Sequence, residues 1–250
     1  MDKSMYSTSH TNTCAEAITM ARFALHGPFD IPGIAWCSSR IPNDSNSEYL
    51  AALGIAVPDE IRRSIPKRQR EYVIGRLCAR EAVRRLRPGF DSNIPTGSDR
   101  QPLFPAGITG SITHTDDFAA AACRPMEDGL LGIDVERVMT PERAAEVVPA
   151  VSSTDELGLD GWNDTLPLVR ATLVFSAKEA AFKALYPKVH RFLEFSSSRL
   201  VGVDIFARVL QLSLTTDLGN GWCTGRVLSA RFNVDKERVL TLVAVPHALR

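Results

Sequence analysis

The segment Gly132-Ile133-Asp134-Val135-Glu136 lies near the middle of the 250-residue chain and predicts a β-strand, Leu130–Glu136. Side chains two residues apart project from the same face of a strand, so Asp134 and Glu136 should present two carboxylates side by side. Two such charges repel each other unless a cation lies between them, and hard divalent cations prefer oxygen ligands. A solvated strand end is the ordinary alternative, and the segment by itself leaves both possibilities open.

Outward from this strand, both halves of the chain show the same order of elements, a long helix and then antiparallel strands. Apolar spacing predicts the helices at Pro66–Leu86 and Leu168–Tyr186. The other strands are predicted at Ile31–Ser39, Ile108–His114, Phe118–Arg124, Leu200–Ile205, Val209–Thr215, Thr224–Asp235 and Arg238–Val245. The order of elements predicts an α+β fold of two pseudo-equivalent lobes, each a long helix packed on a small antiparallel sheet.

Local signals set the expected boundaries of the helices. Ser64 is expected to cap the first long helix, and Pro187 is expected to end the second. Shorter helices should begin at Thr140-Pro141-Glu142 and at Ser153-x-x-Glu156, which has the capping-box pattern. The predicted organisation is a loose N-terminal tail (1–25), a first lobe (26–125) and a second lobe (126–250).

Composition excludes several classes of protein. The 29 Lys and Arg residues balance the 29 Asp and Glu residues, so no net charge favours nucleic acid or an anionic membrane. No apolar run approaches the ~18–20 residues of a membrane span, and residues 1–14 lack the apolar core of a signal peptide. The five cysteines are scattered and form no Cys-x-x-Cys pair. This usage argues against a disulfide framework and a zinc site, and it predicts a cytoplasmic protein.

The second long helix contains Phe175-Ser176-Ala177-Lys178-Glu179-Ala180-Ala181-Phe182-Lys183-Ala184. One interpretation is structural, because Ser176-x-x-Glu179 has the capping-box pattern and Glu179 with Lys183 forms a favourable i,i+4 pair. However, the apolar spacing starts the helix before Ser176, so no cap is needed there. Glu179, Lys183 and Tyr186 form one stripe, separate from a stripe of small residues. Packing of the small residues on a neighbour would turn the charged stripe toward a cleft.

The strand Gly110-Ser111-Ile112-Thr113-His114 ends in a histidine beside the polar turn Thr115-Asp116-Asp117. A histidine in this position is commonly a surface residue. The functional alternative makes His114, with Ser111 or Thr113, a hydrogen-bond donor to a phosphate. A metal site of His114, Asp116 and Asp117 is a further alternative, although consecutive carboxylates in a turn usually face water.

Between Arg62 and Arg87, ten Lys and Arg residues accompany only Glu71 and Glu81, an excess of eight positive charges. Such a run is usually the solvated face of a helix. It also fits nucleic acid, but aromatic residues for stacking are scarce. A compact polyanion such as a nucleotide cofactor suits it as well, because arginine matches the geometry of phosphate.

In this order, the motifs Gly110–His114, Gly132–Glu136 and Phe175–Lys183 resemble the three motifs of the phosphopantetheinyl transferase superfamily. More narrowly, the chain is similar to the long, two-lobed type, which includes the surfactin-type enzymes and the transferase component of enterobactin synthase. The basic run and the segment Arg100-Gln-Pro-Leu-Phe-Pro105 add to this resemblance. It covers about residues 60–195, and the turn after His114 departs from it, since many relatives carry a glycine there.

The resemblance implies a role for each matching residue. The implied ligands of a divalent metal, Mg²⁺ or alternatively Mn²⁺, are Asp134, Glu136 and Glu179. Glu179 would also be the catalytic base, and Lys183 would stabilise charge at the pyrophosphate. His114 would contact the 3′-phosphate of coenzyme A. The remaining residues implied in cofactor binding are Arg68, Arg76, Arg100, Ser111, Thr113 and Lys178.

The resemblance also implies the reaction, the transfer of 4′-phosphopantetheine from coenzyme A to a serine of an apo-acyl or apo-peptidyl carrier protein, with release of 3′,5′-ADP. The active site would lie in the cleft between the lobes of a monomer, without nucleic acid or membrane insertion. A carrier would dock at a rim that contains Arg137, Arg143, Lys188 and Arg191. A metal-dependent phosphohydrolase, a nucleic-acid-binding module and a catalytically idle coenzyme A-binding protein are the alternatives.

Overall fold

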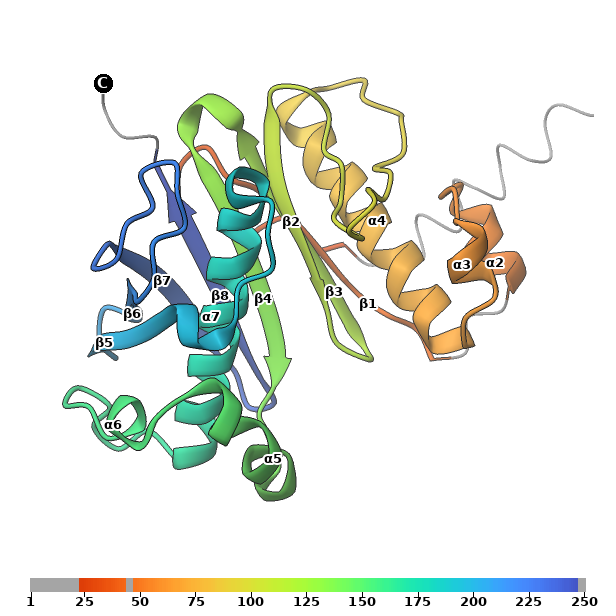
Figure 1. Ribbon diagram of the computed structural model, residues 1–250. Helices are drawn as coiled ribbons and strands as arrows, with labels where there is room; N and C mark the ends of the chain where they lie inside the picture. Colours follow the sequence, from red (N-terminus) through yellow and green to blue (C-terminus); the bar gives the residue numbers. More distant parts are fainter. Residues whose placement is uncertain (1–22, 44–46, 247–250) are drawn as a thin grey trace, which may run out of the picture.

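The computed structural model describes residues 23–43 and 47–246. It has an α+β fold in which two antiparallel sheets each carry one long helix (Figure 1). The predicted α+β class is confirmed. Nearly all of the predicted tail, residues 1–25, lies outside the described residues.

The first sheet has three strands in the order β1-β3-β2. These strands are β1 (Ala35–Arg40), β2 (Ile108–His114) and β3 (Phe118–Pro125). The helix α4 (Pro66–Leu86) covers one face of this sheet (Figure 1). Its fully buried Ile74 and Leu77 pack in one cluster with Ala119 and Ala121 of β3, whose small side chains let the helix approach closely.

The second sheet has five strands in the order β4-β8-β7-β6-β5. They are β4 (Leu130–Arg137), β5 (Ser198–Asp204), β6 (Val209–Leu214), β7 (Val227–Val234) and β8 (Arg238–Val245). The helix α7 (Pro167–Val189) lies across β4 and β8. At Gly132 a Cβ atom would lie 2.1 Å from the carbonyl oxygen of Ala180, so only glycine allows this contact. The predicted small-residue stripe of α7 therefore packs on β4.

The alternation of side chains along β4 decides what faces α7. Leu131 and Ile133 pack with Trp36 of β1 and with Ala120 and Ala122 of β3, in an apolar cluster that joins the two sheets. The intervening residues point the other way. Consequently the even-numbered residues of β4, which include both carboxylates of the Asp-x-Glu pair, belong to the α7 side.

Two of the predicted helix signals act differently in the structure, and β1 and β7 begin later than predicted, at Ala35 and Val227. Ser64 does not cap α4: the cap position is Ile65, without a side-chain hydrogen bond, and Ser64 Oγ donates to the carbonyl of Ile61 at 2.6 Å. Pro187 does not end α7. It lies in the last turn, where its missing N–H removes a single hydrogen bond, and the helix ends at Val189, capped by His190 in the left-handed region with φ 49°.

Shorter helices complete the fold. They are α2 (Ser47–Ala52), α3 (Asp59–Arg62), α5 (Pro141–Val151), α6 (Thr154–Leu157) and the 3₁₀ turns η1 (Met126–Asp128) and η2 (Phe195–Ser197). The predicted cap at Thr140 and the predicted capping box of Ser153 with Glu156 are both present. Over residues 23–43 and 47–246, no helix combines the length and the apolar character needed to cross a membrane.

Candidate active site

Asp134 is the central carboxylate of the site. The close packing at Gly132 brings this part of β4 onto α7, and Asp134 Oδ1 lies 2.6 Å from Lys183 Nζ. Thr113 of β2 donates a second hydrogen bond to the same oxygen at 3.2 Å. The other oxygen, Oδ2, is buried without a hydrogen-bond partner, and the residue is only 2% exposed. A buried carboxylate oxygen without a partner costs free energy and marks a place where a cation would bind favourably.

Glu136 and Glu179 share the electrostatic environment of Asp134. Burial, followed by the charge of Asp134, raises the pKa of Glu136 to about 8. Burial and then Asp134 also raise the pKa of Glu179, against the opposing effect of Lys183. We call Asp134, Glu136, Glu179 and Lys183 the acidic site. It has three carboxylates to one ammonium group, so a divalent cation would relieve its repulsion.

The donors of the acidic site fit a hard divalent cation by their chemistry. All three are carboxylates, and Asp134 Oδ2 is the unpartnered donor that such an ion would use. Among the residues that the structure describes, no three or more His, Cys, Asp or Glu side chains are already gathered into a metal-ligand group. The fit therefore rests on oxygen chemistry, the unpartnered atom and the mutual repulsion.

A second group of charged residues surrounds His114 at the end of β2. Arg68 Nη1 donates to His114 Nε2 at 3.0 Å, so a neutral ring carries its proton on Nδ1, which lies 3.8 Å from Glu71 Oε2. Burial, and then the charge of Arg68, lowers the pKa of His114 to about 4. The ring is neutral at pH 7, and its contact with Glu71 is polar rather than ionic. We call Lys67, Arg68, Glu71 and His114 the histidine cluster.

The predicted phosphate donors Ser111 and Thr113 have other partners in the structure. Ser111 Oγ accepts a hydrogen bond from the backbone N–H of Ile133 at 3.1 Å, and Thr113 Oγ1 accepts one from the N–H of Val135 at 3.0 Å. Both residues are 3% exposed. Their hydroxyl groups thus connect β2 to β4, the strand that carries the acidic site, and so place His114 beside it.

The arginines predicted for phosphate binding differ in their surroundings. Arg76 is buried: Nη2 donates to Thr96 Oγ1 at 2.8 Å, the guanidinium lies 5.1 Å from the centre of the Tyr72 ring, and Nη1 has no hydrogen-bond partner. Burial lowers its pKa. Arg100, in contrast, is 81% exposed, 3.4 Å from Glu60, and has a φ of 65°. The structure thus places one arginine in the interior and leaves the other available to a ligand.

Lys178, predicted to bind the cofactor, lies apart from the acidic site and has other partners. Its Nζ lies 2.8 Å from Glu156 Oε1 and donates to the carbonyl of Val151 at 2.7 Å. Its side chain is 3% exposed. Five residues separate Lys178 from Lys183, so they point in different directions on α7. Lys178 therefore ties α5 and α6 to α7.

A cavity of about 460 Å³ opens beside Lys183. Its lining combines the segment Asp99–Phe104, the first part of β2 and the last turns of α7. Tyr186, which lies on the predicted stripe with Glu179 and Lys183, is one wall, and its hydroxyl donates to Asp99 Oδ2 at 2.8 Å. Lys183 of the acidic site and the predicted basic segment at Arg100 thus line one cavity.

Comparison with known proteins decides the family. The 4′-phosphopantetheinyl transferase N-terminal domain matches residues 57–124, and the 4′-phosphopantetheinyl transferase superfamily domain matches residues 130–232. Enterobactin synthase component D of Salmonella typhimurium is 36% identical over 194 residues, which span 76% of this chain and 79% of the relative. The chain belongs to the 4′-phosphopantetheinyl transferase superfamily. The sequence motifs had predicted this membership.

Other members of the superfamily are similar over shorter lengths. Transferase Svp of Streptomyces mobaraensis is 34% identical over 59% of this chain and 61% of its own length. Transferase Npt of Nocardia iowensis is 34% identical over 56% of this chain and 62% of its own length. With further enterobactin synthase D components the alignment spans 53–55% of the relative, about half its length. The long type of the superfamily is the one that these relatives indicate.

Sequence reasoning missed some residues of the site. Glu71, 8% exposed, lies between Lys67, Arg68 and His114, and Thr96 holds Arg76. An acid within an otherwise basic run was a signal for Glu71. Nothing in the sequence around Thr96 distinguishes it, because a loop residue acquires its partner only through folding.

Proposed function

We propose that this member of the superfamily transfers 4′-phosphopantetheine from coenzyme A to a serine of an apo-carrier protein, depends on Mg²⁺ and releases 3′,5′-ADP. The observation that carries the proposal is Asp134, whose Oδ2 is buried and unpartnered while Oδ1 contacts Lys183. This arrangement offers a cation a ligand and keeps an ammonium group beside it. Membership of the superfamily supplies the reaction class.

The metal would be held by Asp134, Glu136 and Glu179. Held there, Mg²⁺ would supply positive charge to neutralise the pyrophosphate. The residues of the histidine cluster would bind the 3′-phosphate: a dianion beside His114 would favour the protonated ring, which then donates from Nε2. Arg68 and the exposed Arg100 would contribute further charge, and the cavity beside Lys183 offers room for part of the cofactor.

In the transfer step, Glu179 would accept the proton of the carrier serine, consistent with a carboxyl pKa that burial raises. The serine oxygen forms a bond to the phosphorus attached to pantetheine, and the bond from that phosphorus to the oxygen of 3′,5′-ADP breaks. Lys183 is 26% exposed and can stabilise charge on the departing phosphate. The proton goes to Glu179 and the electron pair to the leaving group.

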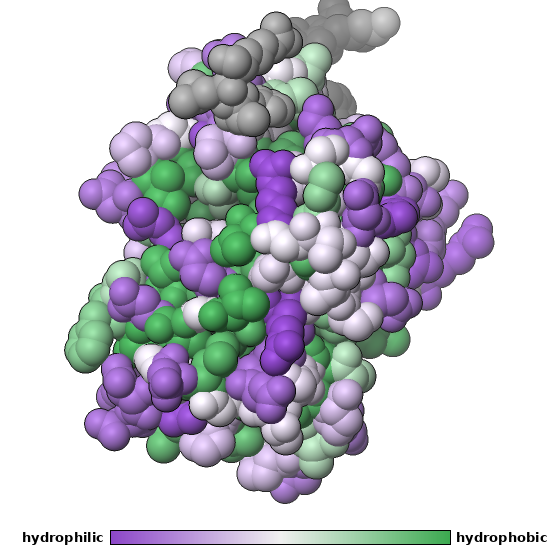
Figure 2. All heavy atoms as spheres, turned by 60° about the vertical axis from the view of Figure 1, so that its left-hand side comes forward, coloured by the Kyte–Doolittle hydropathy of each residue, from purple (hydrophilic) through white to green (hydrophobic). Residues whose placement is uncertain are grey.

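The proposal includes the architecture and the partner. Residues 26–125 and 126–250 would act as two lobes of a monomer with the acidic site between them, and both acyl and peptidyl carriers would be accepted. Figure 2 shows a face on which hydrophobic side chains gather in a broad area bordered by hydrophilic ones. Exposed large hydrophobic residues of the second half include Leu166, Phe192, Val201 and Phe206. A mixed surface of this kind would tolerate more than one carrier.

The basic helix does not favour the nucleic-acid alternative. Arg76 and Arg80 of α4 are buried, and Arg84 is bound to Glu81 at 2.7 Å and also pairs with Asp91. These side chains are buried or paired with carboxylates of the protein, so they do not form an exposed stripe that could bind a phosphate backbone. No observed feature favours transfer to water.

The experiment is mass spectrometry of an apo-carrier incubated with the protein, coenzyme A and Mg²⁺. We expect a gain of about 340 Da on the carrier, the mass of the phosphopantetheine group that coenzyme A carries. The Asp134→Ala protein is the matched control and should leave the carrier unchanged. Release of free phosphopantetheine without any carrier adduct would identify a hydrolase instead.

A further inference from the structure

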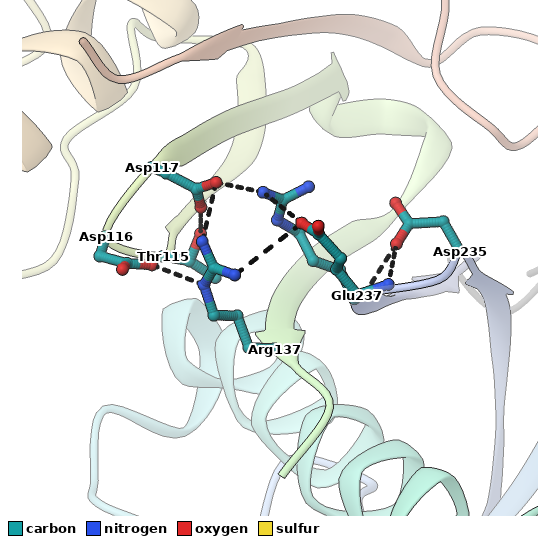
Figure 3. A network of polar contacts seen from close by, with 7 residues as sticks. Thr115, Asp116, Asp117, Arg137, Asp235 and Glu237 are labelled. Carbon is teal, nitrogen blue, oxygen red and sulfur yellow. Dashed lines mark hydrogen bonds and ion pairs between the residues drawn. The ribbon is translucent and has the colours of Figure 1, made fainter. Parts of the chain in front are cut away.

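A network of charged side chains connects the turn after His114 to the second sheet (Figure 3). Arg137, at the end of β4, lies between the carboxylates of the turn and the β7–β8 hairpin. Its Nε donates to Asp116 Oδ1 at 2.8 Å, and its Nη2 lies 2.9 Å from Asp117 Oδ2. Its Nη1 is 3.8 Å from Glu237 Oε2. The guanidinium therefore contacts three carboxylates from two connections that are far apart in sequence.

A second arginine shares these partners. Arg238 directly opposes Arg137 in the β4–β8 pairing, and it also binds Asp117 Oδ2. Two like charges directly opposite each other destabilise a pair of strands. Here Asp117, whose side chain is 25% exposed, forms ion pairs with both guanidinium groups, accepts a hydrogen bond from Arg238 and offsets this repulsion. The paired arginines of one sheet thus hold a turn of the other sheet.

The turn is also ordered within itself. Thr115 N–H donates to the carbonyl of Phe118 at 2.7 Å, and Thr115 Oγ1 donates to Asp117 Oδ1 at 3.0 Å. The N–H of Ile41 donates to the carbonyl of Asp117 at 2.8 Å. Because these hydrogen bonds hold the turn together, the position of its carboxylates also sets the position of His114, which directly precedes the turn.

The two ends of the network adjoin the two halves of the site. Asp116 and Asp117 follow His114 by two and three residues, and Arg137 follows Glu136 directly. Successive side chains of a strand point to opposite faces, so Arg137 turns away from the acidic site while its backbone continues that of Glu136. The network has no direct contact with the acidic site, so any effect on the chemistry must pass through position.

We propose that Arg137 is a positioning residue: by holding the Thr115–Asp117 turn against the end of β4, it fixes His114 relative to Glu136. This inference rests on the proposed function, because it assigns the histidine to the 3′-phosphate of coenzyme A. It gives Arg137 a role other than the predicted one in the rim that docks a carrier, since its guanidinium already pairs with three carboxylates. It also gives a role to Thr115-Asp116-Asp117, which stands where many relatives carry a glycine: the two carboxylates are the groups to which Arg137 binds.

The contribution to global stability should be small. Exposed ion pairs contribute little to stability, and the side chains of Arg137 and Asp116 are 44% and 49% exposed. The hydrogen bond from Arg137 lowers the pKa of Asp116, so the carboxylate is ionised at neutral pH. An Arg137 variant should therefore still fold, with the histidine cluster less well aligned on the acidic site.

The test compares coenzyme A with its 3′-dephospho form in Arg137→Gln, with Arg199→Gln as the matched control. Arg199 also forms an exposed pair, 3.3 Å from Asp155, but lies on β5. Arg137→Gln should lose about tenfold of the wild-type preference for the 3′-phosphate in kcat/KM, less than the ~10²-fold that a 1 Å misplacement can cost. Arg137→Lys should restore part of the preference, and the control should keep all of it.

Two further measurements separate positioning from a general loss of structure. In the double variant Arg137→Gln with His114→Ala, the preference should fall no further than in His114→Ala alone, because both act through one contact. Calorimetric binding of 3′,5′-ADP and 5′-AMP should show the same loss without turnover. An unchanged preference in Arg137→Gln, or full additivity in the double variant, overturns the positioning role. A wild-type protein that binds coenzyme A without modifying a carrier overturns the proposed function alone, and one that does not bind coenzyme A overturns both.

Discussion

The acidic site and the histidine cluster lie on the two sides of the β2–β4 junction, and their charges are balanced differently. In the acidic site, Asp134 keeps an oxygen without a partner and burial raises the pKa of Glu136 to about 8. In the histidine cluster, Glu71 lies within 4 Å of both Lys67 and Arg68, and His114 is neutral. The first group has excess negative charge that a cation would balance, whereas the second has two cations, one carboxylate and a neutral imidazole, an excess positive charge that suits an anion. Under the proposed function, chemistry would depend on the first group and cofactor binding on the second.

The largest effect is expected at the carboxylates. Asp134→Ala, Glu136→Ala and Glu179→Gln should each lower the transfer rate at least ~10²-fold, the scale of losing a metal clamp or a base. Each protein should still fold, because removing a carboxylate from a repulsive group does not weaken the core. Single-turnover transfer to an apo-carrier, with circular dichroism as the folding control, measures both properties. Normal turnover of a folded Glu179→Gln protein would show that Glu179 has no catalytic role and would remove this difference between the acidic site and the histidine cluster.

The two lysines of α7 sharpen the comparison between structure and chemistry. Lys178→Met breaks a buried ion pair and leaves Glu156 without its cation, so the free energy of unfolding should fall by about 3–5 kcal/mol. Lys183→Met removes a partly exposed group and should lower the transfer rate with a much smaller change in stability. Urea unfolding measures the stability of both variants, and transfer kinetics measures their rates. Equal stability losses would mean that the surroundings of these lysines do not set their roles.

The histidine cluster and Arg100 should act mainly through binding of coenzyme A. His114→Ala and Arg100→Ala are each expected to raise the KM for coenzyme A about tenfold, with a smaller change in kcat, since these contacts exist in both the ground state and the transition state. Steady-state kinetics at saturating carrier concentration gives the two constants separately. For His114 the increase should disappear with 3′-dephospho-coenzyme A. A fall in kcat without a change in KM would place the cluster with the acidic site.

The smallest effect concerns pH and stability without metal. The folded pKa of Glu136, about 8, lies above the ordinary value of 4.5, so the folded state binds the extra proton. The stability that this extra proton contributes to the folded state is complete below pH 4.5 and is lost as the pH rises through 8. The midpoint of thermal unfolding should therefore fall less between pH 6 and pH 9 in Glu136→Gln than in the wild type. Parallel pH profiles would show that Glu136 is not protonated in the folded protein, and adding Mg²⁺ should raise only the wild-type midpoint substantially.

Sequence patterns were most informative where one residue or one period decides the local structure. The limits of α4, β2 and β8 agree with the prediction because uninterrupted periodicity and turn residues define them locally. Asp134 was found through strand alternation. The stripe of Glu179, Lys183 and Tyr186 followed from helical spacing, and Gly132 against Ala180 shows why small residues flank it.

Other assignments needed the packing of distant segments. Lys178 and Lys183 have the same side chain on one helix, and only the positions of Glu156 and Asp134 make one a structural residue and the other a site residue. The sequence predicts Ser111 and Thr113 as hydrogen-bond donors to a phosphate. In the structure their hydroxyl groups accept hydrogen bonds from the backbone N–H groups of β4. A side chain's partner depends on which segments meet, and local patterns do not contain this information.

By itself the sequence determined the fold class, the superfamily and the acidic residues, because periodicity and motif order are properties of the chain. Tertiary structure alone decided which charges are satisfied. It buried Arg76, paired Lys178 with Glu156, neutralised His114 and left Asp134 Oδ2 without a partner. The physical reason is that charge balance depends on distance and burial in three dimensions, and residues as far apart as Asp117 and Arg238 come within hydrogen-bonding distance only after folding.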